Sequence, residues 1–418
     1  MNTSKRASAR RWGPAAIGLT AAAGLVLSGC AAAGGGGSGD ADEIVIGFAL
    51  SQSGNMAPFD VEPGNAALLR VEEINENGGI DGTEIRTVVK DVQSSTETMG
   101  VVTSELIAEG ADLIVTPCDF DLSAPGAIAA QGAGIPAISI CAGDPKTADR
   151  TTLGDHVFTA NAGSDVEGAT GASWAFDQDW TSAYLLQDES IEYTKSTGVY
   201  FQAAFEELGG EVVGTSSFPG GDSVDIGAQI SDIRANAADL DFIYVASWNP
   251  AGATAVKQIR DSGIDLPIVT PAAVDGQLLI DIAGNVSDVY YTAFTCYVYC
   301  SGADSEGPQE FVDAYQAKYD AEPSSGYALH GYNLMLMLEQ ALAETASFEP
   351  EPIYETIQAG IAVETPIGEL QYFNETCNKI IDFPFSILEL SGGEVEFVTQ
   401  HTAALIPDTG DGNACATQ

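Results

Sequence analysis

Cysteine and histidine are among the residue types in this 418-residue sequence that could bind a metal or attack a substrate. The three histidines, His156, His330 and His401, lie far from one another and from the cysteines. No Cys-x-x-Cys pair occurs, and a zinc site needs tighter clustering. The GxSxG, GxxxxGK[ST] and HExxH motifs are also missing. We therefore expect no metal, no cofactor and no enzymatic activity; a Ser/His/Asp site assembled through the fold is the remaining enzymatic alternative.

Cys30 is a different kind of reactive residue, because it follows a basic and then apolar leader. Four basic residues stand near the start, and the run from Ala15 to Val26 is almost wholly apolar or small. The leader and the tetrapeptide Leu-Ser-Gly-Cys that ends at Cys30 resemble the signal peptide and lipobox of a bacterial lipoprotein. The resemblance implies cleavage before Cys30 and lipidation of its thiol. The alternative is an ordinary signal peptide or an apolar N-terminal helix, although the run is shorter than the roughly 20 residues that span a bilayer.

The lipobox implies an extracytoplasmic protein that is lipid-anchored to the outer face of the cytoplasmic membrane. Residues 1–29 are then the signal peptide, and the glycine-rich residues 30–42 are a flexible tether. Six cysteines remain, and an even number in an oxidising compartment indicates disulfides. Fifteen pairings are possible, and proximity in sequence favours Cys118–Cys141, Cys296–Cys300 and Cys377–Cys415.

The sequence is strongly acidic, with a formal net charge of −45 at pH 7. This charge argues against nucleic acid or an anionic membrane surface as a partner. The acidic residues are expected to cover a solvated surface. We therefore expect the protein to contact the membrane only through the N-terminal lipid.

Short apolar runs rich in β-branched residues alternate with longer amphipathic stretches, which predicts an α/β fold with parallel sheets. The expected strands include Ile44–Leu50, Ile85–Asp91, Leu113–Thr116, Ser182–Gln187, Phe242–Ala246 and Phe385–Leu390. The expected helices include Pro63–Asn77, Thr96–Glu109, Ala124–Gln131, Ser164–Phe176, Thr194–Leu208 and Gly252–Ser262. After about residue 300 the chain is predicted to be mainly helical, before two short final strands.

Several segments resemble the type I periplasmic binding proteins, and more narrowly the branched-chain amino-acid-binding receptors of ABC transporters. These segments are IVIGFALSQSG at 44–54, LLRVEEINENGGIDG at 68–82, GDSVDIGAQISDIRANAADLDFIYV at 221–245, and YVASWNPAGATAVKQIRDSGI at 244–264. The resemblance extends over residues 43–395. It implies two Rossmann-like lobes joined by three hinge strands, the arrangement called a Venus flytrap.

The resemblance also implies that each lobe is built from two stretches of chain. We expect 43–160 plus 294–364 in lobe 1, and 161–293 plus 365–418 in lobe 2. The crossings between the lobes are expected near Thr159–Gly163, Tyr291–Thr295 and Val363–Gly368. A ligand would bind in the cleft at the carboxyl ends of the strands, and hinge closure would bury it.

Candidate ligand-binding residues lie in the loops that follow the predicted strands. They are Phe59, Asp119, Ala142 and Gly143 in lobe 1, and Tyr193, Trp248, Ala272 and Asp275 in lobe 2. Aromatic side chains offer large apolar faces, and Tyr and Trp can also donate a hydrogen bond. The alternative for each aromatic residue is packing within its own lobe.

Asp119 departs from the amino-acid-binding pattern, in which the family places a serine here and a threonine near Gly143. An aspartate would repel a ligand carboxylate, so a cationic, amide, urea-like or polyhydroxylated solute would suit it better. The alternative is that Asp119 or Asp121 caps the helix that begins near Ser123. Both interpretations of Asp119 stay open.

The resemblance implies an extracytoplasmic receptor of an ABC importer that captures a small polar molecule, such as an amino acid, an amide or a urea-like solute. The expected partners are that solute and the permease subunits of the transporter, and the receptor is expected to be a monomer. A ligand-sensing lipoprotein that signals to a membrane partner is the alternative, and this sequence does not separate the two.

Overall fold

Continuous apolar segments form the central strands of the computed structural model, which describes residues 43–221, 224–297, 299–302, 306–409 and 415. Five parallel strands in the order β2-β1-β3-β4-β5 make the first sheet. They are β1 (Ile44–Leu50), β2 (Ile85–Asp91), β3 (Leu113–Thr116), β4 (Ala137–Ser139) and β5 (Val157–Thr159). Every residue of β1 is buried, as expected for a parallel strand covered on both faces. We call this sheet and the helices packed on it the first lobe.

The second sheet has eight strands in the order β11-β16-β15-β10-β9-β8-β6-β7. They are β6 (Ser182–Asp188), β7 (Glu211–Phe218), β8 (Phe242–Ala246), β9 (Ile268–Thr270), β10 (Val289–Ala293), β11 (Cys300–Ser301), β15 (Phe385–Ser391) and β16 (Glu394–His401). The run from β10 to β7 is parallel, and β15 is antiparallel to both β10 and β16. We call this sheet with its helices the second lobe.

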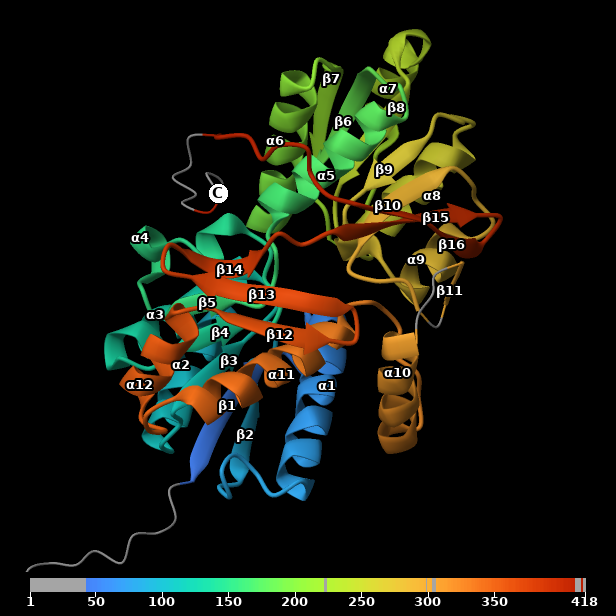
Figure 1. Cartoon of the computed structure of the whole chain (residues 1–418). Helices are drawn as coiled ribbons and strands as arrows, with labels where there is room; N and C mark the ends of the chain where they lie inside the picture. The colour runs from blue at the N-terminus through green and yellow to red at the C-terminus, as the bar shows by residue number, and fades with distance from the viewer. Residues whose placement is uncertain (1–42, 222–223, 298, 303–305, 410–414, 416–418) are drawn as a thin grey trace, which may run out of the picture. The chain divides into compact units, whose positions relative to one another are not determined.

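A third sheet joins β12 (Ile361–Thr365), β13 (Gly368–Asn374) and β14 (Cys377–Ile381) in antiparallel order. Figure 1 shows it beside β5 of the first lobe, and β14 contacts β5. The chain therefore enters the second sheet between Ile381 and Phe385, later than the crossing expected near Val363–Gly368, because β13 and β14 pair with β12 rather than with β15. The residue limits of the two lobes stay a prediction.

Helices cover both faces of each large sheet. The first lobe has α1 (Ala57–Glu76), α2 (Thr96–Ala108), α3 (Phe120–Ala133), α4 (Arg150–Leu153), α10 (Glu306–Tyr319), α11 (Ala328–Glu344) and α12 (Pro350–Gln358). The second lobe has α5 (Ser164–Asp177), α6 (Glu192–Glu207), α7 (Gly227–Asn236), α8 (Ala251–Asp261) and α9 (Gln277–Ala283). Single 3₁₀ turns lie at Pro145–Thr147, Ala237–Asp239 and Ala272–Val274.

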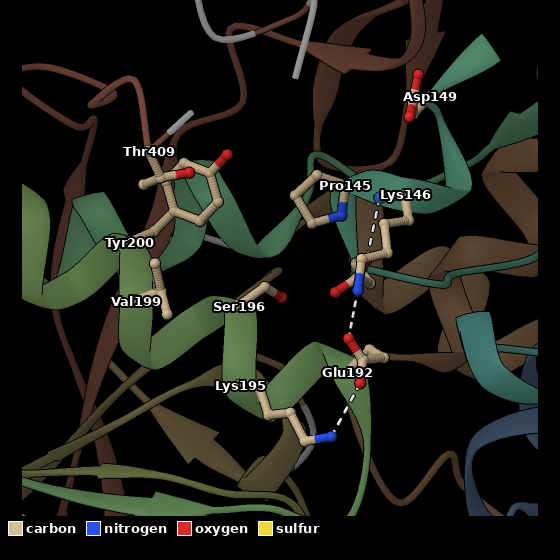
Figure 2. Close-up of a pocket in the computed structure, with 10 residues that line it drawn as sticks. Pro145, Lys146, Asp149, Glu192, Lys195, Ser196, Val199, Tyr200 and Thr409 are labelled. Atoms are coloured by element: carbon tan, nitrogen blue, oxygen red, sulfur yellow. Dashed lines mark hydrogen bonds and ion pairs between the residues drawn. The ribbon is translucent and has the colours of Figure 1, made fainter. Parts of the chain in front are cut away.

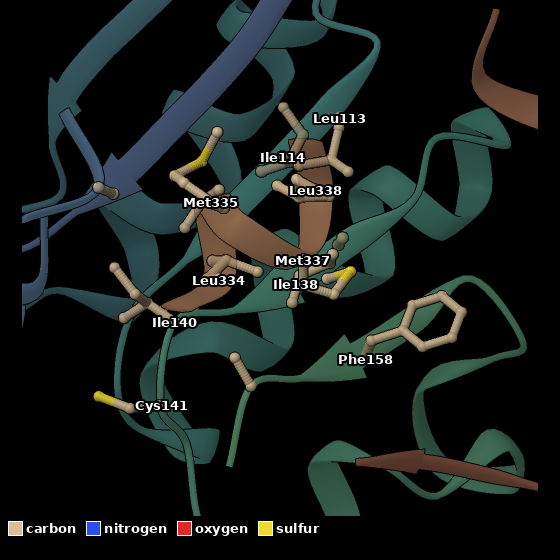
Figure 3. Packing of buried hydrophobic residues seen from close by; sticks show 14 of the residues in the cluster. Leu113, Ile114, Ile138, Ile140, Cys141, Phe158, Leu334, Met335, Met337 and Leu338 are labelled. Atoms are coloured by element: carbon tan, nitrogen blue, oxygen red, sulfur yellow. The ribbon is translucent and has the colours of Figure 1, made fainter. Parts of the chain in front are cut away.

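The apolar core follows the periodicities of these elements. In β6, Tyr184 and Leu186 belong to the cluster under α7 and α8, whereas Ala183 and Leu185 belong to the cluster under α5 and α6. This alternation is the period of two of a strand that is buried on both faces. In the first lobe, α11 presents Leu334, Met335, Met337 and Leu338 to Ile114 of β3, Ile138 of β4 and their neighbours (Figure 3). The α11 helix thus closes the core beneath the cleft.

Three disulfides join the pairs that proximity in sequence favoured: Cys118–Cys141, Cys296–Cys300 and Cys377–Cys415. The first links the segments that follow β3 and β4. The second lies in the segment that enters β11, and the third ties Cys415 to β14. Cys30 and the rest of residues 1–42 lie outside the described residues.

In the part of the chain that the structure describes, no helix combines the length and the apolar character needed to cross a membrane. The same residues contain no group of three or more His, Cys, Asp or Glu side chains arranged to hold a metal ion.

Candidate ligand-binding site

A small cavity of about 20 Å³ lies where the carboxyl ends of the strands of both lobes meet. It is lined by Met56, Phe59, Cys118, Cys141, Gly143, Asn161, Ile191, Tyr193, Trp248, Ala273 and Tyr327. Most of these residues lie in segments that follow β1, β3, β4, β5, β6, β8 or β9. Ligands of open α/β sheets bind at this end of the strands. We call this cavity the central cavity.

Aromatic rings from the two lobes meet at the central cavity. Phe59 is on the first turn of α1, and its ring centroid lies 5.6 Å from that of Trp248, which follows β8 of the second lobe. Phe59 also meets Tyr327, just before α11, in an edge-to-face contact at 5.4 Å. The rings nearly fill the space, which holds about one water molecule. A larger solute must separate Phe59 from Trp248, so its entry requires the lobes or these rings to move.

Tyr193 forms another wall and is held from behind by a buried carboxyl group. Its hydroxyl donates to Oε2 of Glu167 on α5 at 2.7 Å. Oε1 of Glu167 accepts from the backbone N–H of Ala272 at 2.5 Å and from the Thr292 hydroxyl at 2.7 Å. Burial raises the pKa of Glu167, and these three hydrogen bonds oppose that rise. Glu167 thereby fixes Tyr193 against the loop that follows β9.

Trp248 and Gly143 are also fixed by specific contacts. The Trp248 indole donates from Nε1 to the Ser190 hydroxyl at 2.9 Å. A Cβ atom at Gly143 would lie 2.9 Å from the ring of Tyr193, which is closer than real Cβ contacts come. Glycine at 143 therefore allows the Tyr193 ring of the second lobe to approach the backbone of the first.

Asp119 lies behind the cavity wall and caps a helix. Its Oδ1 accepts from the backbone N–H of Leu122 at 2.8 Å, so it is the N-cap of α3. Its Oδ2 is buried and has no hydrogen-bond partner among the described residues. Burial raises the pKa of Asp119 to about 7, and nearby Asp121, Asp60 and Asp144 add to the rise. The capping alternative for Asp119 therefore accounts for one of its oxygens.

Asp275 holds the two lobes together rather than lining the cavity. Its carboxyl group accepts from the Tyr299 hydroxyl at 2.7 and 2.6 Å and from the backbone N–H of Gly326, before α11, at 2.9 Å. Burial raises its pKa to about 6. The carboxyl group of Asp275 is thus engaged by donors within the protein.

The structure thus brings four of the eight candidate residues to the cavity wall: Phe59, Gly143, Tyr193 and Trp248. Ala142 and Ala272 lie one residue behind it. The Ala142 amide donates to the Ser139 hydroxyl, and the Ala272 amide donates to Glu167. Contact between any of the eight residues and a ligand stays a prediction.

The sequence analysis did not name Met56, Asn161, Ile191 or Tyr327 as ligand-binding residues. It named Cys118 and Cys141 only as a disulfide, and Ala273 only within the candidate segment from Ala272 to Asp275. Tyr327 precedes a helix rather than following a strand, so the rule that selected strand-end loops could not find it. Asn161 follows β5, in the segment Thr159–Gly163 that was expected only to cross between the lobes. Met56 and Ile191 carry no polar group that would distinguish them from core residues.

A second, larger cavity of about 230 Å³ lies beside the cleft, between residues 144–149 and α6 (Figure 2). Its wall is charged, and Glu192 pairs with both Lys146 and Lys195. The backbone N–H of Glu192, at the start of α6, donates to Oδ2 of Asp121 in the first lobe at 2.9 Å. These groups satisfy one another across the lobes. We call this charged region the rim and interpret it as a contact of the closed cleft.

Two lobes, a cavity at the strand ends and aromatic walls from both sides define a two-lobed binding protein. A family model described as periplasmic binding protein matches residues 43–394. The chain therefore belongs to the periplasmic binding protein family. Proteins of this family are extracytoplasmic receptors for small solutes that work with ABC transporters and are not enzymes.

Individual relatives bind different solutes. The leucine-, isoleucine-, valine-, threonine- and alanine-binding protein of Pseudomonas aeruginosa is 22% identical over 82% of this chain and 89% of its own length. A branched-chain amino acid transporter substrate-binding protein from Streptococcus pneumoniae, solved with isoleucine, is 25% identical with a TM-score of 0.72, covering 85% of this chain and 99% of that one. A solute-binding protein from R. palustris in complex with benzoate is 21% identical with a TM-score of 0.69, covering 88% and 98%.

Proposed function

We propose that this protein is the solute receptor of an ABC importer and captures a small polar molecule in the central cavity by closure of the two lobes. The observation that carries the proposal is the meeting of Phe59 and Trp248, which come from opposite lobes and share one cavity. A solute between these rings contacts both lobes at once. It therefore stabilises the closed arrangement by its differential affinity for that state.

The rim supports the same proposal. Closure brings Asp121 to the amino end of α6 and Lys146 to Glu192, and these are contacts that an open cleft would lose. They are exposed and contribute little each. The rim therefore contributes little to the free energy that keeps the lobes together, and a solute that contacts both lobes would add to it.

The experiment is a thermal melting screen of the mature protein against amino acids, amides, urea, polyamines, aromatic acids and sugars. A solute at a hundred times its dissociation constant should stabilise the protein by about 2.7 kcal/mol. Each hit is then incubated and analysed by mass spectrometry, since a receptor releases its solute unchanged. If the whole screen gives no shift, the receptor proposal is wrong.

We further propose that the receptor is held outside the cytoplasmic membrane by a lipid on Cys30. The basic and apolar leader and the lipobox support this assignment, and so does membership of an extracytoplasmic family. In a bacterial expression host, Cys30→Ala should release the protein from the membrane fraction while the wild type stays there. Retention of the Cys30→Ala variant in the membrane would contradict the anchor.

A further inference from the structure

Four residues of the central cavity wall have backbone N–H groups without an acceptor among the described residues. They are Gly143 and Asn161 in the first lobe, and Trp248 and Ala273 in the second. All four residues are buried. In folded proteins, about nine in ten or more of the buried backbone N–H groups have a partner. The concentration of four such donors on one cavity wall therefore indicates that a ligand supplies the acceptors.

These four amides form two pairs, and each pair lies at the ends of two neighbouring parallel strands. Gly143 follows β4 and Asn161 follows β5, and these strands are paired in the first sheet. Trp248 follows β8 and Ala273 follows β9, which are neighbours in the second sheet. A Cβ atom at Gly143 would lie 3.6 Å from Nδ2 of Asn161, and the residue after Trp248 donates its amide to the Ala273 carbonyl at 2.9 Å. Each lobe thus contributes two neighbouring amides to the cavity.

The carbonyl groups of the same four residues are all occupied. Each accepts from a backbone N–H of the protein at 2.6 to 3.0 Å, and the donors are Ser164 for Gly143, Ile380 for Asn161, Gly252 for Trp248 and Asn249 for Ala273. The backbone of these four residues therefore leaves hydrogen-bond donors for a ligand, and not acceptors.

No carboxylate lines the cavity to receive an ammonium group. Among the described lining residues, none is Asp, Glu, Lys or Arg. Glu167 lies behind Tyr193, and its oxygens accept from Tyr193, Ala272 and Thr292. The Tyr327 hydroxyl hydrogen-bonds with that of Tyr193. A buried ammonium ion without a carboxylate is strongly disfavoured, whereas two or three backbone N–H groups stabilise a carboxylate.

The remaining wall suits an apolar body. Phe59, Trp248 and Tyr327 place aromatic rings around the cavity, and Met56 and Ile191 add aliphatic surface. Aromatic rings bury apolar groups and pack well against other rings. Their faces also attract cations, but this attraction is smaller than the cost of removing an unpaired cation from water. The rings therefore do not replace the missing carboxylate.

We infer that the central cavity selects solutes with a carboxylate on an apolar body and without an ammonium group. The amides of Gly143 and Asn161 bind the solute from the first lobe, and those of Trp248 and Ala273 bind it from the second. The same hydrogen bonds that hold the solute thus join the two lobes. The inference rests on the proposed receptor function and narrows its solute class.

The test uses matched probes in isothermal titration calorimetry with the mature protein. The compound 4-methyl-2-oxopentanoate is compared with leucine, and 3-phenylpropionate with phenethylamine, so that each pair shares an apolar body and only one member carries an ammonium group. We expect the member without the ammonium group to bind at least tenfold more tightly. If leucine or phenethylamine binds as tightly as its counterpart or more tightly, the inference is wrong while the receptor function stands.

Ala273→Pro tests one of the four amides, because proline has no N–H. The Ala273 amide makes no bond to the described residues, and Ala273 lies in the first turn of the 3₁₀ segment Ala272–Val274, where proline is tolerated. The affinity for 3-phenylpropionate should fall at least tenfold, whereas that for phenethylamine should not fall. An unchanged affinity for 3-phenylpropionate in a variant that melts as the wild type does would overturn the role of this amide.

Ala273→Asp tests the preference for a carboxylate by placing a negative charge on the wall, and Ala273→Asn is the matched control of similar size. In Ala273→Asp, 3-phenylpropionate should bind at least tenfold more weakly than in Ala273→Asn, because like charges repel. Equal affinities in the two variants would contradict a carboxylate site at Ala273. If none of the four probes binds to the wild type, the inference fails, and the wider melting screen decides separately whether the receptor proposal survives.

Discussion

The central cavity and the rim differ in where their charged groups lie. Around the cavity, the carboxyl groups of Asp60, Asp119 and Glu167 are buried behind a wall of uncharged side chains. At the rim, Lys146 and Glu192 are partly exposed and neutralise each other across the lobes. Exposed ion pairs are worth little, whereas fully desolvated aromatic contacts carry most of a binding energy. The difference is the physical reason for proposing that solute binds in the cavity and that the rim only assists closure.

The largest effect is expected from Trp248→Ala, which removes one wall of the cavity. Affinity for any solute found in the screen should fall at least 100-fold, because a central aromatic anchor is lost. Calorimetry measures this directly. Trp180→Ala is the matched control, since Trp180 packs against Trp174 and Phe242 within the second lobe. That variant should lose about 3 kcal/mol of stability and keep its affinity.

The next largest effect is on stability and concerns Asp119, a buried acid behind the cavity. Burial raises the pKa of Asp119 to about 7, above its unfolded value, so the folded state favours the protonated form. Stability should therefore decrease as the pH rises from about 4 to about 7. Asp119→Asn keeps a capping side chain and removes the charge, so it should raise the free energy of unfolding at pH 8 by about 2 kcal/mol. Urea unfolding at pH 4 and pH 8 measures the change.

The pKa of Asp241 is shifted in the opposite direction to that of Asp119, so Asp241 serves as a comparison. Hydrogen bonds from Thr181 and Ser182 outweigh its burial and lower its pKa, so its stabilisation is present above its unfolded pKa and is lost as the pH falls. Asp241→Asn should therefore destabilise the protein at pH 8. If Asp119→Asn is also destabilising at pH 8, the assignment of Asp119 as a buried acid whose charged form destabilises the fold is wrong.

Gly143→Ala should produce an intermediate effect on binding. The added Cβ would press on the ring of Tyr193 across the lobes, and a shift of a few tenths of an ångström disturbs the closed cavity. We expect solute affinity to fall about tenfold, mainly through faster dissociation. Stopped-flow fluorescence of Trp248 can follow the rate. Gly132→Ala, on the exposed side of α3 with open space at its Cβ, should leave the rate unchanged.

The smallest effect is expected at the rim. Lys146→Ala removes the ion pair with Glu192 and should cost about 0.5 kcal/mol of stability. Affinity should change less than threefold, and even less at high salt, where the pair is screened. If Lys146→Ala lowers solute affinity as much as Trp248→Ala does, the rim and not the cavity alone determines binding, and the comparison drawn above is wrong.

The sequence predicted the buried strands well because their signal is local. Ile44–Leu50 and Phe242–Ala246 match β1 and β8 at both ends, since continuous apolar runs specify strands that are buried on both faces. Helix α1 was expected to begin at Pro63 but begins at Ala57. Proline favours the first turn, and Pro58 rather than Pro63 occupies it.

The site was only partly predictable because its closure depends on distant contacts. Strand-end loops gave Phe59, Gly143, Tyr193 and Trp248, whereas Tyr327 reaches Phe59 only through the packing of α11 on α1. The partner of Tyr193 could not be foreseen either. Glu167 lies in the first turn of the expected helix Ser164–Phe176, where an acidic residue is typical of a solvated helix end, yet it is buried and points to the site.

The most direct test of the account is melting of the wild type and of Trp248→Ala with the same solute panel. We predict that at least one solute raises the melting temperature of the wild type and fails to raise that of Trp248→Ala at the same concentration. An equal shift in both proteins would place the solute elsewhere and contradict the assignment of the central cavity as the binding site.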